Sequence, residues 1–240
     1  MDTPESHGFL YLIPTTLGDN EPLEVLPISI KRTIEGINHY IVENEKTARR
    51  FIKKVSPRKS QPDLNIQLLN KFTDPESLPS FLEPCRQGFD VGILSEAGCP
   101  GIADPGADVV LLAHKLNIRV VPMVGPSSII LALMASGLNG QSFAFNGYLP
   151  IETSDRKKSI RSIEKHSRNI GQAQIFIETP YRNDKLLAEF LKSLSGETLL
   201  CIACDLSLPT ELVTTCTVNE WKQRKLPDLH KRPAIFIIQA

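Results

Sequence analysis

The feature that most limits the fold of this chain is the alternation of short apolar runs with longer, helix-like segments. In the first half, apolar runs occupy residues 9–14, 39–44, 64–69, 90–95 and 118–124, and segments with helical spacing of apolar residues separate them. Strands that alternate with helices need crossover connections, which place the strands parallel in a sheet covered on both faces. The first half is therefore predicted to be an α/β domain with a mostly parallel sheet.

The second half has a different connection pattern. Further apolar runs occupy residues 142–149, 172–178, 198–206, 211–218 and 233–240. The third and fourth of these follow each other too closely for a helical crossover, so they are predicted to pair antiparallel. The sequence thus predicts two α/β domains, residues 1–122 with the mostly parallel sheet and residues 123–240 with a mixed sheet.

Charge and cysteine content exclude several classes of protein. The 240 residues carry 27 basic and 27 acidic side chains, so no field of the whole molecule attracts nucleic acid, and any such preference must be local. The five cysteines are scattered, which favours reduced thiols. Cys201 and Cys204 lie in an apolar run that turns them to opposite faces, so they are predicted to be buried and no metal site is expected.

A cytoplasmic location without a membrane span is expected. The first eight residues include early acids and no long apolar run, which argues against a secretory signal. Residues 120–151 contain no charged side chain, but Pro122, Gly125 and Pro126 interrupt them. The unbroken apolar part is too short to cross a bilayer, so a buried helix is predicted there.

Three loops rich in glycine and proline follow predicted strands, at residues 14–19, 95–101 and 124–128. Open α/β sheets bind ligands at the carboxyl ends of their strands, where the backbone can approach a ligand closely. The loops are therefore predicted to converge on a small-molecule crevice. Purely structural roles are also open: Asp104 could cap the helix that begins with Pro105, and Ser127 or Ser128 could cap the next helix.

Spacing alone does not identify the ligand. The chain contains no dinucleotide-binding G-x-G-x-x-G, no P-loop and no H-E-x-x-H, and its histidines are isolated. Five stretches do form a recognisable series: LYLIPTTLGD, ILSEAGCPGIADPG, IRVVPMVGPSSIILALMASGL, FAFNGYLP and IFIETPYR. In order and over nearly the whole chain, they resemble the motifs of the tetrapyrrole methylase superfamily, most closely its small-subunit ribosomal RNA methyltransferase I branch.

This resemblance implies a homodimeric methyltransferase that binds S-adenosylmethionine between two α/β domains. Carried over position by position, the residues implied to bind the cofactor are Pro14, Gly18, Ser95, Glu96, Ala97, Gly98, Ile102, Asp104, Ser127, Ser128, Glu178, Thr179, Pro180 and Pro233.

The implied reaction needs few catalytic groups from the protein. The methyl donor is already activated, so positioning of the acceptor supplies much of the rate acceleration. If the acceptor is a ribose 2′-hydroxyl of a cytidine, a carboxylate could accept its proton, and Glu96, Asp104 and Glu178 are the catalytic candidates. Each of them is equally suited to orienting a loop.

The acceptor is less defined than the donor. Two basic segments could bind ribosomal RNA or the small ribosomal subunit, although solvated helix faces explain them equally well. They consist of Lys46, Arg49, Arg50, Lys53, Lys54, Arg58 and Lys59, and of Arg156, Lys157, Lys158, Arg161, Lys165 and Arg168. The chain departs from the ribosomal RNA branch at VENEKTARR, NIQLLNKF and ACDLSLPTELV, all on the acceptor side. Methylation of a tetrapyrrole or another small molecule, and cofactor binding with little catalysis, therefore stay open.

Overall fold

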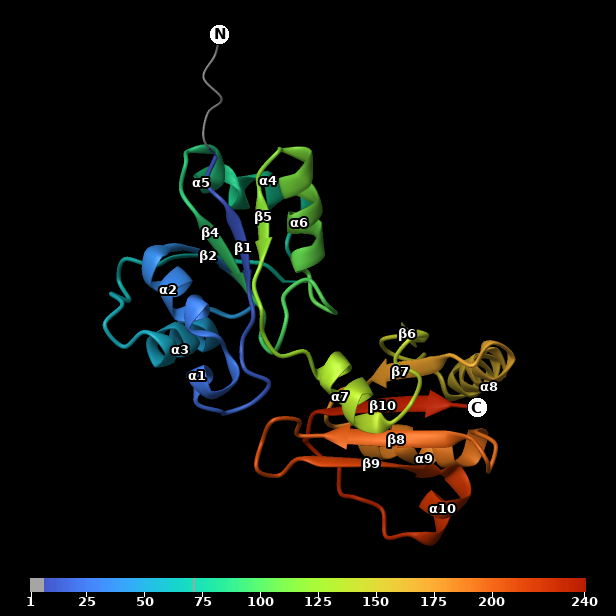
Figure 1. The fold of residues 1–240 in the computed structure, drawn as a ribbon. Coiled ribbons are helices and arrows are strands. Elements are labelled where there is room, and N and C mark those ends of the chain that lie inside the picture. The colour runs from blue at the N-terminus through green and yellow to red at the C-terminus, as the bar shows by residue number, and fades with distance from the viewer. Residues whose placement is uncertain (1–6, 71) are drawn as a thin grey trace. The chain divides into compact units, whose positions relative to one another are not determined.

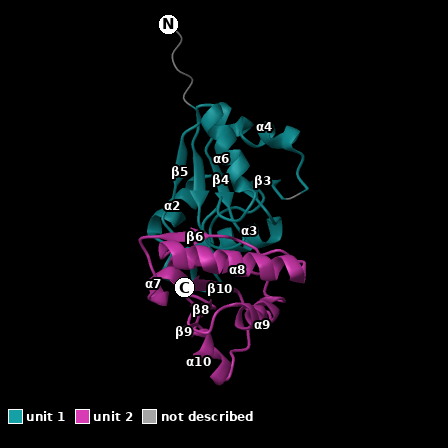
Figure 2. Ribbon diagram, turned by 90° about the vertical axis from the view of Figure 1, so that its right-hand side faces the viewer, with its two compact units in different colours: residues 1–127 teal, residues 128–240 magenta. Residues whose placement is uncertain are grey.

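The structure is a computed structural model that describes residues 7–70 and 72–240. The early acids at residues 1–6 and Lys71 of the NIQLLNKF stretch lie outside the described residues. The chain forms two compact units, Met1–Ser127 and Ser128–Ala240, which Figure 2 colours separately. Each unit has its own sheet and helices, which confirms the prediction of two α/β domains. A functional domain boundary after residue 122 stays a prediction.

The sheet of unit 1 is entirely parallel. Its strands are β1 (Leu10–Ile13), β2 (His39–Val42), β3 (Asn65–Leu68), β4 (Val91–Leu94) and β5 (Val120–Pro122). They are arranged in the order β3-β2-β4-β1-β5. The strands β4, β1 and β5 are therefore neighbours, and the three special loops leave the sheet at the same edge.

Helices cover both faces of this sheet (Figure 1). The helices α1 (Pro22–Val25), α2 (Ile28–Gly36) and α3 (Glu45–Val55) pack on one core, and η1 (Pro75–Ser77), α4 (Leu78–Phe81), α5 (Glu83–Arg86) and α6 (Gly106–Lys115) lie with the other. Alternate strand residues divide between the cores, since Ile13 joins the first and Leu10 the second.

Two helical segments are more broken than their apolar spacing suggests. The segment from Pro22 to Gly36 is divided into α1 and α2, and the segment from Pro75 to Arg86 into η1, α4 and α5. Prolines explain both breaks, because proline lacks an N–H and disfavours the helical conformation of the residue before it. Leu26, which precedes Pro27, is extended with ψ 137°.

Unit 2 contains the predicted mixed sheet. Its strands are β6 (Phe143–Phe145), β7 (Ala173–Ile177), β8 (Leu199–Cys204), β9 (Leu212–Thr217) and β10 (Ala234–Gln239), in the order β6-β7-β10-β8-β9. The pair β6 and β7 is parallel and the other three pairs are antiparallel. The antiparallel pairing of β8 with β9 confirms the prediction from their short connection.

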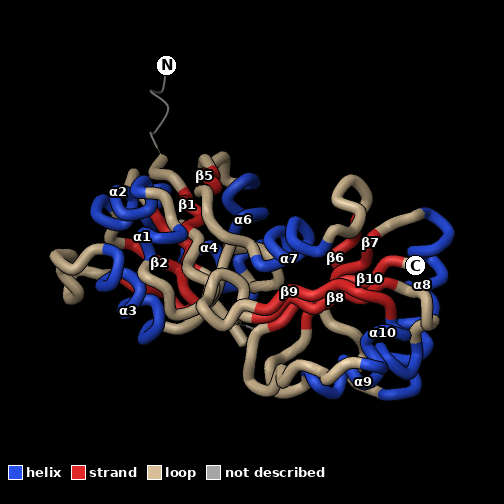
Figure 3. Tube along the Cα trace, turned by 60° about the horizontal axis from the view of Figure 1, so that its bottom comes forward, coloured by secondary structure: helices blue, strands red, loops and turns tan. Residues whose placement is uncertain are grey.

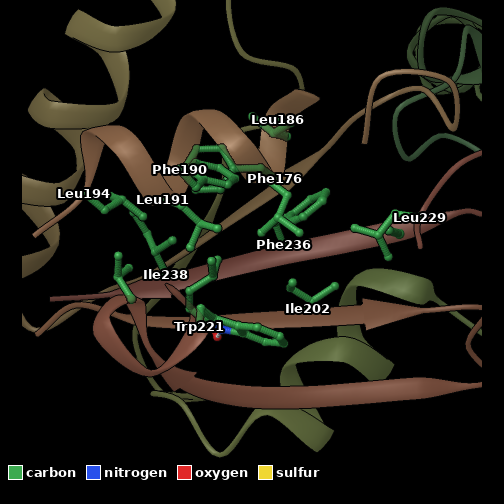
Figure 4. Close-up of a cluster of buried hydrophobic side chains, with 14 of the residues drawn as sticks. Phe176, Leu186, Phe190, Leu191, Leu194, Ile202, Trp221, Leu229, Phe236 and Ile238 are labelled. Atoms are coloured by element: carbon green, nitrogen blue, oxygen red, sulfur yellow. Dashed lines mark hydrogen bonds between the residues drawn. The ribbon is translucent and has the colours of Figure 1, made fainter. Parts of the chain in front are cut away.

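The main core of unit 2 lies under α8 (Thr153–Ile170), α9 (Asn183–Ser193) and α10 (Val218–Gln223). Phe176, Phe190 and Phe236 meet there, and Trp221 donates its indole N–H to the carbonyl of Leu200 at 2.8 Å (Figure 4). The sequence analysis did not predict α10. Thr217 and Glu220 form a capping box at its start, a short-range signal that was present in the sequence.

The opposite face of this sheet carries α7 (Ser128–Ser136), as Figure 3 shows. Ala132 and Leu133 of α7 are buried, but Ile130 is 44% and Met134 74% exposed. The prediction of a buried helix was therefore wrong for the side of α7 that carries Ile130 and Met134. Among residues 7–70 and 72–240, none of the helices combines the length and apolar character that crossing a bilayer demands.

The five cysteines are all free thiols, and only Cys99 is not buried. In β8, Cys204 joins the main core, whereas Cys201 lies on the α7 side of the sheet, in register with Thr215, whose hydroxyl bonds to α7. This confirms the interpretation of both residues as buried core cysteines.

Candidate functional site

The loop after β1 is bonded to the loop after β4. The backbone N–H of Thr15 donates to the carbonyl oxygen of Gly98 at 2.9 Å, and the Thr15 hydroxyl donates to the carbonyl of Ser95 at 3.2 Å. The Ser95 hydroxyl donates to the same Gly98 oxygen at 2.7 Å. Thr15 and Ser95 are buried, so these bonds are shielded from water and fix the two loops to each other.

The loop after β5 packs against the other two. A Cβ added to Gly98 would lie 3.2 Å from the carbonyl oxygen of Pro126, and one added to Gly125 would lie 2.2 Å from Cβ of Pro14. Gly98 also has φ +75°, a conformation that L residues with side chains rarely adopt. The three loops that were predicted to converge therefore do so, and Gly98 and Gly125 allow their close approach.

Asp104 organises the rest of the second loop. Its Oδ1 accepts the N–H groups of Gly101 and Gly106, each at 2.8 Å. Gly106 is the first residue of α6, and Pro105 takes the N-cap position that the sequence analysis gave to Asp104, a shift of one residue. Burial raises the pKa of Asp104, and the two N–H donors partly oppose this shift. Asp104 thus holds the loop and the start of α6 together.

The other predicted residues of unit 1 lie on these loops. Pro14 and Gly18 belong to the first loop, Ala97 and Ile102 are exposed on the second, and Ser127 ends the third. Ser128 is the first residue of α7 and belongs to unit 2.

Glu96 lies exposed on the second loop and accepts a hydrogen bond of 2.5 Å from the hydroxyl of Thr47, in the first turn of α3. Asn44 caps that helix, with its Oδ1 accepting from the N–H groups of Lys46 and Thr47. The capped first turn of α3 therefore fixes the position of the Glu96 carboxylate.

The predicted residues of unit 2 form a group of their own. Glu178 follows β7 and Pro233 precedes β10, and these strands pair antiparallel with Ile177 opposite Ile235. The N–H of Lys231 donates to the carbonyl of Pro180 at 3.0 Å, so the two segments are also bonded.

The Glu178 side chain is only 6% exposed and its Oε1 accepts from the Thr179 N–H at 2.7 Å. The same oxygen accepts from Nη2 of Arg182 at 2.6 Å. Its carboxylate is therefore already engaged in ordering this segment.

Glu43 is a member of the site that sequence reasoning missed. It follows β2 directly, and burial, the nearby Asp104 and the Glu96 carboxylate all raise its pKa, while the Glu96 backbone N–H acts in the opposite direction. The signal was an acid near the end of the apolar run at residues 39–44. It could not be used from the sequence, because only the strand order places β2 beside β4.

Two hollows open at this edge of the sheet. One, of about 480 Å³, is bounded by the first loop from Thr15 to Asn20, by the segment from Leu94 to Glu96, and by α3. The other, of about 650 Å³, is more open and is lined by Glu43, Asn70, Phe72 and the segment from Ala103 to Pro105. Both volumes are in the range of small-molecule sites.

Comparisons with known proteins agree on one family. The family model described as Tetrapyrrole (Corrin/Porphyrin) Methylases matches residues 38–222. A ribosomal RNA small subunit methyltransferase I of Vibrio cholerae is 28% identical over 88% of this chain and 69% of its own length. One from Buchnera aphidicola is 26% identical over 99% and 80% of the two chains. The crystal structure of a cobalt precorrin-4 methyltransferase superposes with a TM-score of 0.63 at 14% identity, covering 100% of this chain and 98% of that one.

We predict that Gly98→Ala loosens the junction of the loops. The new Cβ would meet Leu17 at 3.1 Å and Pro126 at 3.2 Å, and the residue would keep an unfavourable positive φ. We expect the free energy of unfolding, measured by chemical denaturation, to fall by at least about 1 kcal/mol. Gly36→Ala is the matched control, because nothing lies within 4 Å of its added Cβ. Equal transition midpoints for the two variants would contradict this account.

A second prediction concerns Glu43 and pH. Because its pKa is raised in the folded state, its ionised form lowers the free energy of unfolding above that pKa. This cost disappears as the pH falls below the ordinary value of 4.5. We expect Glu43→Gln to raise the melting temperature at pH 8 but not at pH 4, whereas the exposed control Glu24→Gln changes it little at either pH. A stabilisation that is the same at both pH values would rule out this electrostatic cause.

Proposed function

This chain belongs to the tetrapyrrole (corrin/porphyrin) methylase family, and we propose that it transfers a methyl group from S-adenosylmethionine to small-subunit ribosomal RNA. The acceptor atom in this proposal is the 2′-hydroxyl of a cytidine ribose. The observation that carries it is the meeting of three backbone-lined loops at the carboxyl edge of the parallel sheet in unit 1.

The residues at this edge suit the proposed cofactor. Glycine at position 98 lets the chain approach the Pro126 carbonyl, and glycine at position 125 lets it approach the Pro14 ring. Glu43, Glu96 and Asp104 bring negative charge together, and S-adenosylmethionine presents a sulfonium and an ammonium group that would relieve their mutual repulsion. When bound, it supplies an electrophilic methyl group.

We assign the cofactor to the loops of unit 1, where Pro14, Gly18, Ser95, Ala97, Gly98, Ile102 and Ser127 would contact it. Ser128, Thr179, Pro180 and Pro233 of unit 2 stay predictions from the family resemblance. Main-chain groups at these positions would orient it with little side-chain rearrangement.

The three candidate carboxylates suit different tasks. One oxygen of Asp104 holds two loop N–H groups, and one oxygen of Glu178 holds Thr179 and Arg182, which supports orienting roles for both. Glu96 is exposed and is held from one side by Thr47. We therefore propose that Glu96 accepts the proton of the ribose hydroxyl as the methyl group is transferred.

We also propose that the protein works as a cytoplasmic homodimer. The α7 side of the unit 2 sheet carries an unbroken cross-strand row in which Thr215, Cys201, Ile237, Ile175 and Phe145 are successive neighbours. Phe143 and Phe145 at its end, and Ile130 and Met134 on α7, are exposed. Cys201, Ile237 and Ile175 of the row are buried, so these four exposed side chains form the apolar surface that suits contact with a second copy.

The proposed reaction is tested with the labelled methyl donor. We expect titration calorimetry to detect binding of S-adenosylmethionine, and we expect ribosomal subunits from a strain that lacks this protein to become labelled in their RNA. Label in small molecules alone would replace RNA by a small-molecule acceptor. Binding without any transferred label would indicate a cofactor-binding protein, and absence of binding heat would remove the cofactor assignment.

The role of Glu96 gives a further prediction. Glu96→Gln keeps an oxygen that can accept the Thr47 hydroxyl but lowers the basicity of the group, so we expect kcat to fall at least about tenfold. Cofactor affinity measured by calorimetry should stay within about twofold, since Gln preserves the shape of the side chain. Glu45→Gln, an exposed carboxylate on the same helix as Thr47, is the control. Unchanged methyl transfer by Glu96→Gln would exclude the proton-acceptor role.

A further inference from the structure

The structure separates the basic residues that are available to a ligand from those already engaged. In the first basic segment, Arg49 pairs with Glu45 at 2.7 Å, Lys54 with Asp19 at 3.1 Å, and Lys59 donates to the carbonyl of Glu35 at 2.9 Å. Within residues 7–70 and 72–240, the side chains of Lys46, Arg50, Lys53 and Arg58 have no such partner. Four cations of this segment therefore remain available.

Three of the four lie on one face of a single helix. Lys46, Arg50 and Lys53 are spaced i, i+4 and i+7 in α3 and are all exposed, which makes them neighbours along one stripe. We call these three residues the α3 stripe. The opposite face of the helix is buried through Ala48, Ile52 and Val55, so the stripe points away from the sheet of unit 1.

The α3 stripe borders the hollow of about 480 Å³. The wall that α3 contributes to this hollow includes Thr47, Arg50, Phe51 and Lys54, which are spaced i, i+3, i+4 and i+7 along the helix. Arg50 therefore belongs both to the α3 stripe and to the wall of the hollow. The hollow thus has an exposed guanidinium and a partly exposed aromatic ring on one wall and the first two loops on the others. Arginine and aromatic side chains are the groups on which unpaired nucleic acid bases and phosphates bind.

The second basic segment leaves fewer of its cations available to a ligand. Arg156 of α8 is buried and donates to the carbonyl of Ile151 at 2.9 Å. Three other cations of this segment each lie within 4.0 Å of an acid: Lys157 of Glu189, Lys158 of Asp155, and Arg168 of Glu164. Acidic side chains therefore offset much of the positive charge on α8.

We propose that the α3 stripe and the adjoining wall of the hollow bind a single-stranded segment of the RNA substrate, with phosphates along the stripe and one nucleotide against Arg50 and Phe51. The proposal rests on the proposed function, because it assumes an RNA acceptor. The formal charge of the whole chain is zero, so the attraction must come from local groups of unpaired cations such as this stripe. Each phosphate contact with a single strand contributes about 0.7 to the slope of log affinity against log salt concentration.

The test compares matched triple substitutions. One variant carries Lys46→Gln, Arg50→Gln and Lys53→Gln on the stripe, a second carries Lys158→Gln, Arg161→Gln and Lys165→Gln on α8, and the control carries Lys222→Gln, Arg224→Gln and Lys225→Gln. Every variant loses three positive charges. Affinity for a fluorescent single-stranded ribosomal RNA fragment is measured by anisotropy at several salt concentrations, with calorimetry of S-adenosylmethionine binding as a check on folding.

For the stripe variant we expect affinity to fall at least about tenfold and the salt slope to drop by about 2. Cofactor binding should be retained, and the α8 variant and the control should bind RNA nearly as well as the wild type. RNA affinity that is equal in the stripe variant and the wild type, or a loss confined to the α8 variant, overturns the proposal.

Labelling distinguishes this failure from failure of the proposed function. If the wild type labels RNA but the stripe variant does so with an unchanged KM, only the binding surface is wrong. If the wild type neither labels nor binds RNA, the acceptor proposal fails and the α3 stripe loses its ligand with it.

Discussion

The carbonyl oxygen of Gly98 is the point on which the candidate site depends. It accepts the Thr15 N–H and the Ser95 hydroxyl, and so it joins the loops that leave β1 and β4. The two strands are neighbours, so their loops begin side by side, but the hydrogen bonds determine that the loops stay together. The positive φ of Gly98 belongs to this bend, and the neighbouring Pro126 carbonyl would crowd a side chain there. Ordering of these loops therefore precedes ligand binding, which lowers the entropy cost of binding.

Charge is distributed unevenly around this junction. Glu43, Glu96 and Asp104 gather at the ends of β2 and β4, close enough for the second and third to raise the pKa of the first. Three free cations, Lys46, Arg50 and Lys53, lie on the exposed face of α3, whose first turn also carries Thr47, the partner of Glu96. Such a division suits a reaction with a cationic donor and a polyanionic acceptor, since each would find opposite charge at its own position. A neutral chain can therefore serve both partners.

Much of this was accessible from the sequence. Alternating apolar runs predicted both sheets, and the short link between residues 206 and 211 predicted the antiparallel pairing of β8 with β9. The glycine and proline loops predicted where the site would lie. Strand order was not accessible, because β4 inserts between β1 and β2 although it follows both in sequence, and the position of Glu43 depends on that order.

The sequence also did not reveal which charged side chains pair with each other. Lys54 meets Asp19 and Lys59 meets Glu35 only in the folded chain, so the sequence showed seven equivalent cations where the structure leaves four available. The exposed side of α7 was also predicted wrongly, because the sequence of an apolar helix does not indicate which face a single chain leaves exposed.

The pairing of Lys54 also connects the two halves of the proposed site. Its ammonium group donates to Asp19 and to the carbonyl of Asn20, so α3 holds the far end of the first loop while Thr47 holds the second. The helix is itself anchored to the sheet through Ala48, Ile52 and Val55. The α3 stripe therefore stands at a fixed distance from the loops, because packed helices resist displacement. An acceptor bound along α3 would be positioned by this rigid spacing, so selection of the methylated nucleotide would follow from the geometry of unit 1 without a change in its loops.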